Sequence, residues 1–300
     1  MKREKSRFGI LRLITLIVLT SAAAAAPGVS FLEIPVGARE NALAGAGAAL
    51  ITGPTSTTYN PATAAFTPRS AVFMLNKHFA DTRAEFFGVT LRHGKFAFTP
   101  HFWGTRVSDI EYRTQPTSQP ISTFDATNEA VGTAIAYQVS DRIAVGVTGR
   151  YLHQKILFES SEGWSVDAGG IMRLPERGLT AGLAVNHLGN MNYFLAEKPT
   201  LPTTLRGGVA YERAIARAGS VLVTADALAI KESAPQFRGG VEYRAPNYVA
   251  LRAGYVAGLD AQSISVGFGL FIKHIQFDYA FIPYREELGD GHRFSLGLEL

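Results

Sequence analysis

The sequence predicts an all-β fold: a transmembrane antiparallel β-barrel of about fourteen strands, preceded by an Ala- and Gly-rich N-terminal plug segment. Two observations support this fold class. From residue 70 onward, apolar and polar residues alternate over runs of about ten residues, the length that a tilted membrane strand requires. Residues 31–66 are instead small and largely apolar, without such alternation. One part of the chain is therefore expected to form sheet, and the other to pack.

The first 26 residues have the composition of a Sec signal peptide. A basic stretch is followed by the apolar residues 10–20 and by the small residues 21–26, where a signal peptidase would cleave. The apolar stretch is shorter than the roughly 20 residues of a spanning helix, so a signal is favoured over a membrane anchor. We expect three regions: a signal peptide (1–26), a plug (27–69) and a barrel (70–300).

The formal charge of the whole chain is +4, but this basic excess lies in the predicted signal. Removing its five Lys and Arg residues from 29, and its single Glu from 25, leaves 24 basic and 24 acidic residues. A neutral mature chain gives no reason to expect a nucleic-acid partner. The sequence has no cysteine, so its stability must come from burial and backbone hydrogen bonds rather than from disulfides.

The plug is predicted to fill the lumen of the barrel. Turn residues stand at Gly53-Pro54 and at Asn60-Pro61. Because Pro fixes φ and Asn can hydrogen-bond its own backbone, Asn60-Pro61 is interpreted as a structural turn. Gly45-Ala46-Gly47 is a fragment of a glycine-rich pattern without the strand and helix start that phosphate binding requires, so it indicates close packing.

Fourteen strands are expected after the plug, an even number because both ends of a closed antiparallel sheet must lie on the same side. In the fifth strand, Val147 is expected to face lipid and Thr148 the lumen. The expected ranges are 70–80, 84–92, 95–104, 128–139, 142–155, 162–173, 178–187, 203–213, 219–230, 236–244, 247–256, 261–270, 273–284 and 291–300.

The connections distinguish a barrel from a soluble β-sandwich, which alternation alone would fit equally well. Turns at one end are short, whereas residues 105–127 and 188–202 form long connections at the other end, an asymmetry typical of outer-membrane barrels. An apolar last strand would aggregate unless it closed onto the first. The residues expected to face lipid there, and to be recognised by the assembly machinery, are Phe294, Leu296, Leu298 and Leu300.

Motifs for catalysis or metal binding are absent. The sequence contains no G-x-S-x-G, H-E-x-x-H, P-loop or EF-hand pattern, and its seven histidines are scattered. We therefore expect no catalytic residue, no metal site and no cofactor. Glu286, Glu287 and Asp290 are interpreted as solvated loop charges. His153 and Asp167 could meet on the inward faces of neighbouring strands, although nothing in their spacing requires it.

Three motifs of the plug carry a family resemblance: Gly37-Ala38-Arg39, Gly45-Ala46 and Tyr59-Asn60-Pro61-Ala62. They resemble the N-terminal signature of the PorV/PorQ family of outer-membrane proteins, relatives of the FadL-type fatty-acid transporters. The resemblance implies a fourteen-stranded barrel with an N-terminal plug, in agreement with the strand count. The chain departs from the family pattern at residues 42–44, which replace Gly-Met-Gly, and at Thr52-Gly53, which replace an acidic pair. The role of that acidic pair does not carry over.

Two functions follow from the resemblance. The first is a non-catalytic component of a type IX-like route for protein secretion or cell-surface export, with secreted proteins or secretion components as partners. The alternative is a FadL-like transporter of hydrophobic small molecules such as long-chain fatty acids, in which Arg39 could meet an acidic headgroup, although a lumen-paired or solvated Arg39 is favoured. Both imply Sec export to the outer membrane of a Gram-negative-type bacterium, with lipid and the assembly machinery as partners.

Overall fold

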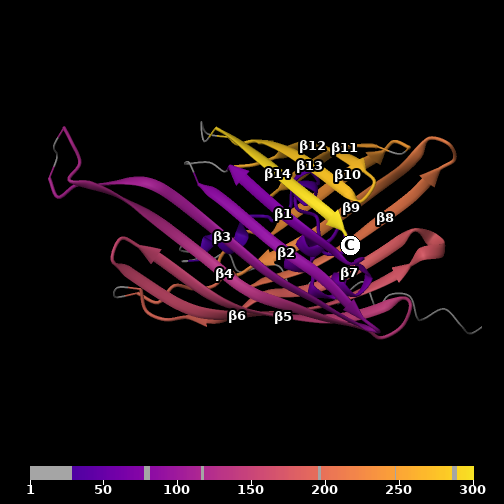
Figure 1. Ribbon diagram of the computed structural model, residues 1–300, viewed down its shortest axis with the longest axis horizontal. Coiled ribbons are helices and arrows are strands. Elements are labelled where there is room, and N and C mark those ends of the chain that lie inside the picture. The colour runs from indigo at the N-terminus through magenta and orange to yellow at the C-terminus, as the bar shows by residue number, and fades with distance from the viewer. Residues whose placement is uncertain (1–28, 78–81, 116–117, 195–196, 247, 286–288) are drawn as a thin grey trace, which may run out of the picture.

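The structure, a computed structural model, describes residues 29–77, 82–115, 118–194, 197–246, 248–285 and 289–300; the predicted signal peptide lies outside these residues. In this part of the chain, fourteen antiparallel strands form one closed barrel (Figure 1). The predicted fold class is confirmed. The strands are β1 (Ser70–Lys77), β2 (Arg83–His93), β3 (Phe96–Tyr112), β4 (Ser122–Gln138), β5 (Ile143–Ile156), β6 (Glu159–Leu174), β7 (Leu179–Met191), β8 (Thr204–Ile215), β9 (Gly219–Ile230), β10 (Gln236–Arg244), β11 (Val249–Ala257), β12 (Ile264–Ile272), β13 (Ile275–Pro283) and β14 (Asp290–Glu299).

The sheet closes between its first and last strands. β1 and β14 pair antiparallel from Ser70 opposite Glu299 to Lys77 opposite His292, and every other strand pairs with its neighbours in the sequence. Closure removes the unpaired sheet edges, so the backbone N–H and C=O groups along the paired wall are satisfied without water.

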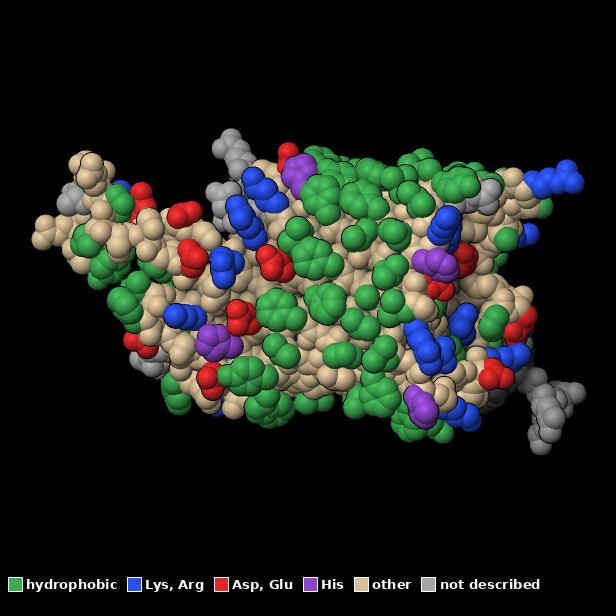
Figure 2. Space-filling model, viewed as in Figure 1, with side chains coloured by type: hydrophobic (Ala, Val, Ile, Leu, Met, Phe, Trp, Pro, Cys, Tyr) green, Lys and Arg blue, Asp and Glu red, His purple; other side chains and the backbone are tan. Residues whose placement is uncertain are grey.

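The outer wall of the barrel is an apolar belt. Along β5, Val147 is 52% exposed whereas its neighbour Thr148 is 1% exposed, which is the alternation expected from the sequence. Figure 2 shows hydrophobic side chains over the middle of the visible face and charged side chains gathered toward its two ends. A continuous belt of this kind is the surface that a bilayer-spanning barrel presents to lipid. At the chain end, the side chains that point outward are Phe294, Leu296, Leu298 and Leu300.

The two long connections are shorter than the sequence predicts. β3 continues to Tyr112 and β4 begins at Ser122, so the predicted connection 105–127 is largely a projecting hairpin (Figure 1). β7 likewise continues to Met191, into the predicted connection 188–202. Beyond the belt both faces of a hairpin meet water, so the apolar-polar alternation fades while the hydrogen-bond ladder continues. At the loop end, β3, β4 and β7 therefore extend further than the predicted ranges.

Connection length still differs between the two ends of the barrel. The turns after β2, β4, β6, β8, β10 and β12 contain four residues or fewer. Most connections at the opposite end are longer, but β5 and β6 are joined only by Leu157 and Phe158, with Leu157 at a φ of +56°. We refer to the two ends as the turn end, where the chain also finishes, and the loop end.

The plug lies inside the barrel, where Figure 1 shows its indigo helices behind β1 and β2. Its helices are short because Gly and Pro interrupt it, and Pro54 and Pro61 each open a 3₁₀ segment, a position where the missing N–H costs nothing. No helix in the described ranges is long and apolar enough to cross a membrane. The helices are η1 (Ser30–Glu33), α1 (Ala38–Ala42), η2 (Pro54–Thr58) and η3 (Pro61–Phe66), with η4 (Pro175–Arg177) in the β6–β7 turn.

Candidate functional site

The plug contacts opposite walls of the lumen. α1 lies against β11 to β14, and η3 lies against β3 to β6. Both contacts are so close that the wall needs glycine: an added Cβ would stand 2.2 Å from Asn60 Oδ1 at Gly169 and 2.6 Å from Ala42 Cβ at Gly267. Side chains at these wall positions would displace the plug. The inward glycines whose Cβ would meet the plug within 3.1 Å are Gly88, Gly146, Gly169, Gly182, Gly240, Gly254 and Gly267.

Asn60 and Pro61, singled out in the sequence, form the contact with the β6 wall. The Asn60 amide Nδ2 donates to Ala48 O at 2.8 Å and to Gly170 O at 3.0 Å, while its Oδ1 accepts from Ala62 N at 3.1 Å. Asn60 is fully buried. It therefore starts η3, ties two plug segments together and joins the plug to the wall, all with uncharged groups.

Arg39, on α1, makes the corresponding contact with the β10 wall. Its Nε and Nη2 donate to the two carboxylate oxygens of Glu242 at 2.8 and 2.7 Å. The same carboxylate accepts from Arg252 Nε at 2.5 Å, and Arg252 Nη1 lies 2.8 Å from Asp278 Oδ1. Two arginines thus alternate with two carboxylates, each pair at charge-assisted hydrogen-bond distance. Arg39 is lumen-paired, so the headgroup role considered for it would require breaking this network.

Glu40, next to Arg39, is a buried carboxyl within the plug. It accepts hydrogen bonds from the hydroxyls of Thr52 and Thr55, and it lies over Gly37, whose φ of +85° and lack of Cβ leave room for it. Burial raises the pKa of Glu40 above the ordinary glutamate value, an effect that the threonine hydrogen bonds and the Arg39 guanidinium partly offset. At the start of α1, Ala38 N donates to Ser295 Oγ at 2.9 Å.

Gly45 belongs to a third contact, with β8 and β9. Its carbonyl accepts from Arg206 Nη1 at 3.0 Å, and its φ is +73°. Arg206 Nη1 also lies 3.1 Å from Asp226 Oδ2, which accepts from Ala48 N at 2.9 Å. The predicted plug residues therefore do not converge on one reactive centre. They fasten the plug at separate points around the lumen.

An apolar cluster fills the lumen on the loop-end side of the plug. Phe31 of η1 meets Trp103 of β3 edge-to-face, with ring centroids 5.6 Å apart. Met191 and Leu201 bring the β7–β8 connection into the cluster, which places it toward the loop end. The members are Val29, Phe31, Leu32, Val36, Val72, Met74, Phe86, Trp103, Ala130, Leu152, Met191 and Leu201.

A small polar pocket adjoins this cluster. Its volume is about 40 Å³, and Leu32 and Trp103 share its wall with Arg206, Arg238 and Asn186. Within the described residues, the buried Trp103 Nε1, Arg206 Nε and both amide atoms of Asn186 have no hydrogen-bond partner. Buried polar groups are nearly always paired, so these groups are available to water or to the polar end of a ligand.

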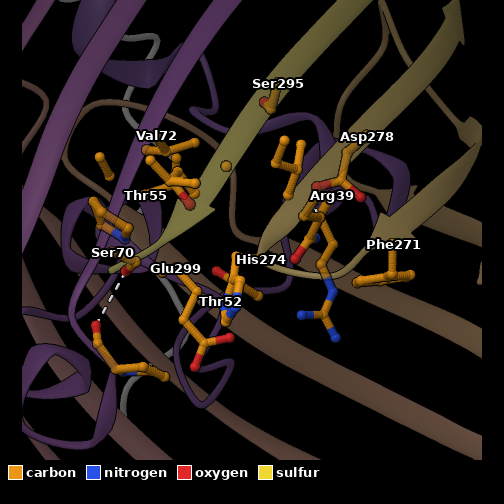
Figure 3. A pocket seen from close by; sticks show the side chains of 18 of the residues that line it. Arg39, Thr52, Thr55, Ser70, Val72, Phe271, His274, Asp278, Ser295 and Glu299 are labelled. Carbon is orange, nitrogen blue, oxygen red and sulfur yellow. Dashed lines mark hydrogen bonds between the residues drawn. The ribbon is translucent and has the colours of Figure 1, made fainter. Parts of the chain in front are cut away.

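A larger pocket opens at the turn end, between the plug and the wall formed by β12, β13, β14 and β1. Its volume is about 230 Å³. Figure 3 shows Arg39, Thr52 and Thr55 of the plug facing His274, Asp278 and Glu299 across it. Apolar groups such as Val72 and Phe271 complete the lining, so this pocket could receive an amphipathic solute.

The possible meeting of His153 and Asp167 does not occur. His153 faces outward, with its Nδ1 3.9 Å from Glu129 Oε2. Asp167 faces the lumen and pairs with Arg150 at 2.7 Å, and it accepts from the backbone N of His187 at 2.8 Å. The two positions have opposite strand parity relative to the belt, which separates them whatever their sequence spacing.

The sequence reasoning did not name the inward charges of the wall as site residues, although a signal for them was present. Arg238 and Glu242, and likewise Arg252 and Asp278, fall at inward positions of period-two strands. Charges there need ionic or hydrogen-bonding partners inside the lumen. In the described part of the chain, no three His, Asp or Glu side chains stand close enough to hold a metal ion. Glu286 and Glu287 lie outside the described residues.

The fold is similar to that of several solved structures. A monoaromatic hydrocarbon channel, CymD, matches with a TM-score of 0.60 and 13% identity over 88% of this chain and 96% of that one. The toluene transporter TodX of Pseudomonas putida matches with a TM-score of 0.59 and 13% identity, over 87% and 96%. A Pseudomonas aeruginosa FadL homologue matches with a TM-score of 0.54 and 13% identity, over 88% and 98%. No protein-family model and no curated protein matches the sequence.

Proposed function

We propose that this chain is a non-catalytic outer-membrane barrel that carries hydrophobic small molecules, as a FadL-like transporter. The observation that carries the proposal is the apolar cluster inside the lumen, with a polar pocket directly beside it. Ligand sites are typically apolar with a few placed polar groups, and this arrangement supplies both. The likeness in fold to a toluene transporter and a monoaromatic hydrocarbon channel supports the same function.

Placement in the outer membrane is part of the proposal. The apolar belt, the closed sheet and the difference between the turn end and the loop end support it, with the loop end facing outward. Arg in place of Val147 on the belt should cost about 2 to 4 kcal/mol of stability near the bilayer midplane. A variant that unfolds at the same urea concentration as the parent in lipid vesicles would contradict the placement.

Transport is tested by adding side-chain volume inside the apolar cluster. Ala130 is fully buried in the cluster, whereas its neighbour Val131 is 55% exposed on the belt. We expect Ala130→Phe to reduce uptake of a labelled long-chain fatty acid or of toluene at least tenfold, and Val131→Phe to leave uptake unchanged. Heat-dependent gel mobility shows whether both variants are folded. Normal uptake by a folded Ala130→Phe variant would contradict the proposal.

The polar pocket allows the solute class to be distinguished. Arg238 lines this pocket and donates to Gln236 Oε1 at 2.7 Å. It makes no ion pair with another described residue. If the solute is a carboxylate, Arg238→Gln should weaken its binding at least tenfold and leave toluene unaffected. If Arg238→Gln weakens the binding of both solutes equally, Arg238 has a structural role and does not bind the carboxylate.

A component of a protein-secretion route is the second candidate. The motif around Asn60-Pro61 and the projecting β3–β4 hairpin, which offers a surface for a protein partner, favour it (Figure 1). Affinity capture from cell envelopes should then recover secreted proteins or secretion components, and shortening the hairpin should abolish the capture while solute uptake continues. Capture that is unchanged by shortening would contradict this candidate.

A further inference from the structure

Five basic residues lie in one register row on the outside of the barrel, near the loop end. Lys77 of β1 pairs with His292 of β14 on one side and with Arg83 of β2 on the other. Arg83 pairs in turn with Arg106 of β3, and across β4 the row reaches Lys155 of β5. Neighbouring strands lie about 4.8 Å apart, so the part of the row from β14 to β3 covers about 14 Å. We call these five residues the rim row.

The Lys and Arg side chains of the rim row face outward and have no partner within the described part of the chain, whereas His292 Nδ1 lies 2.8 Å from Tyr279 OH. Lys77, Arg83, Arg106 and Lys155 are exposed, and no ion pair or side-chain hydrogen bond joins them to another described residue. At the turn end, Arg142 lies 3.0 Å from Glu176, whereas other exposed cations there, such as Lys95, make no ion pair with a described residue. Within the described residues, the rim row therefore presents aligned Lys and Arg side chains that are available to an external anion.

Two further outward rows follow toward the middle of the barrel. The next row, about 6.6 Å further along the strands, contains Glu85, Glu129 and Glu162. Figure 2 shows blue and red side chains together on the left part of the main body, beside the projecting hairpin, and green ones beyond them toward the middle. The third row is apolar and lies in the belt; it consists of Phe73, Phe87, Phe102, Val131, Tyr151 and Trp164.

We propose that this surface binds a phosphorylated glycolipid of the outer leaflet. Arg and Lys of the rim row bind its phosphates, with the planar guanidinium groups of Arg83 and Arg106 suited to bidentate contacts. The carboxylates of the second row accept hydrogen bonds from sugar hydroxyls, and the apolar row receives the acyl chains. A simple anionic phospholipid has no sugar to satisfy the carboxylates, which would repel its phosphate. The proposal rests on the outer-membrane placement under Proposed function, and it is independent of the transported solute.

The test measures lipid binding to the full-length protein by native mass spectrometry in detergent. The lipids are a bisphosphorylated lipid A, the same lipid without its phosphates, and phosphatidylglycerol. The rim variant carries Lys77→Gln, Arg83→Gln and Arg106→Gln. Each cation at an anionic lipid surface contributes roughly fivefold to affinity, so this variant should bind lipid A roughly a hundredfold more weakly. The control removes the same charge from exposed turn-end residues, through Lys95→Gln, Arg213→Gln and Arg217→Gln, and should bind normally.

Several outcomes would overturn the proposal: unchanged affinity of the rim variant, equal loss in the control, or equal binding of the dephosphorylated lipid. Phosphatidylglycerol bound as tightly as lipid A would also overturn it, in favour of general anionic-lipid attraction. The single Arg83→Gln variant, expected to bind roughly fivefold more weakly, covers the case in which the triple variant does not fold. Failure of solute uptake with intact lipid binding would refute only the transport function, whereas a chain that does not insert into vesicles would refute both.

Discussion

The two opposite walls of the lumen hold the plug with different chemistry. On the η3 side, the contacts are close packing against Gly146 and Gly169 and the uncharged hydrogen bonds of Asn60. On the α1 side, glycines again allow close approach, but Arg39 enters a chain of charges through Glu242. One wall therefore depends on shape and on uncharged hydrogen bonds, and the other depends on shape and on charge.

The two contacts should therefore be sensitive to different substitutions. A buried ion pair adds little net stability over a hydrophobic contact, but removing one partner leaves an uncompensated charge. A glycine contact fails only when volume is added to it. Substitutions that delete atoms should thus affect mainly the α1 side, and substitutions that add atoms should affect the η3 side.

The largest effect is expected from Glu242→Ala. Arg39 and Arg252 share the Glu242 carboxylate, and Arg252 is fully buried at its side chain. Removing one member of a buried ionic network typically costs about 3 to 5 kcal/mol. Urea unfolding in lipid vesicles, followed by tryptophan fluorescence, measures this loss. Glu212→Ala, at an exposed turn-end residue, is the control and should change stability little. Equal losses of stability in Glu242→Ala and Glu212→Ala would contradict the role of the charge network in holding the α1 side of the plug.

The next effect concerns two adjacent glycines of β6. A Cβ at Gly169 would stand 2.2 Å from Asn60 Oδ1, whereas at Gly170 the nearest atom is 3.8 Å away. We expect Gly169→Val to destabilise the protein by about 1 to 3 kcal/mol through overpacking. Gly170→Val should cost less, since it points away from the plug. The same urea experiment compares them, and an equal cost would show that the η3 contact is not close-packed.

The smallest effect is expected at Glu40 and depends on pH. Its raised pKa in the folded state means that the folded protein favours the neutral carboxyl, so its contribution to stability is full below pH 4.5, its ordinary pKa, and is lost as the pH rises through the folded-state pKa. Glu40→Gln keeps an acceptor oxygen for Thr52 and Thr55 but cannot ionise. The stability of this variant relative to the parent should therefore increase with pH and then level off. If the stability of Glu40→Gln relative to the parent stays constant or falls as the pH rises, the pKa of Glu40 is not raised in the folded protein.

Much of the wall could be predicted from the sequence, because the apolar-polar alternation of each strand is visible within that strand alone. The predicted ranges 219–230 and 236–244 coincide with β9 and β10, where alternation runs from turn to turn. The projecting parts of β3 and β4 were missed, since a hairpin in water on both faces has no apolar side to reveal it. The sequence predicted that Thr148 faces the lumen but not that this residue is only 1% exposed there.

The plug was predicted less completely than the wall. Its motifs identified Arg39 and Asn60 as notable residues, but they named neither Glu242 nor Gly170 as their partners. A glycine at an inward position has the same sequence signature as a glycine in any strand. Only contact with the plug distinguishes Gly169 from Gly170.

The barrel could be inferred from the sequence alone, because the direction of a side chain on a strand is set by its own backbone and alternates every two residues. Strand number, belt and closing strand all follow from that local rule. The tertiary structure alone decided which inward groups meet. Arg39 and Glu242 are separated by 203 residues along the chain, and their contact exists because closure fixes the register of every strand around the plug. Strand pairing likewise aligns Lys77, Arg83 and Arg106 into one row, since register relates neighbouring strands and no single strand encodes it.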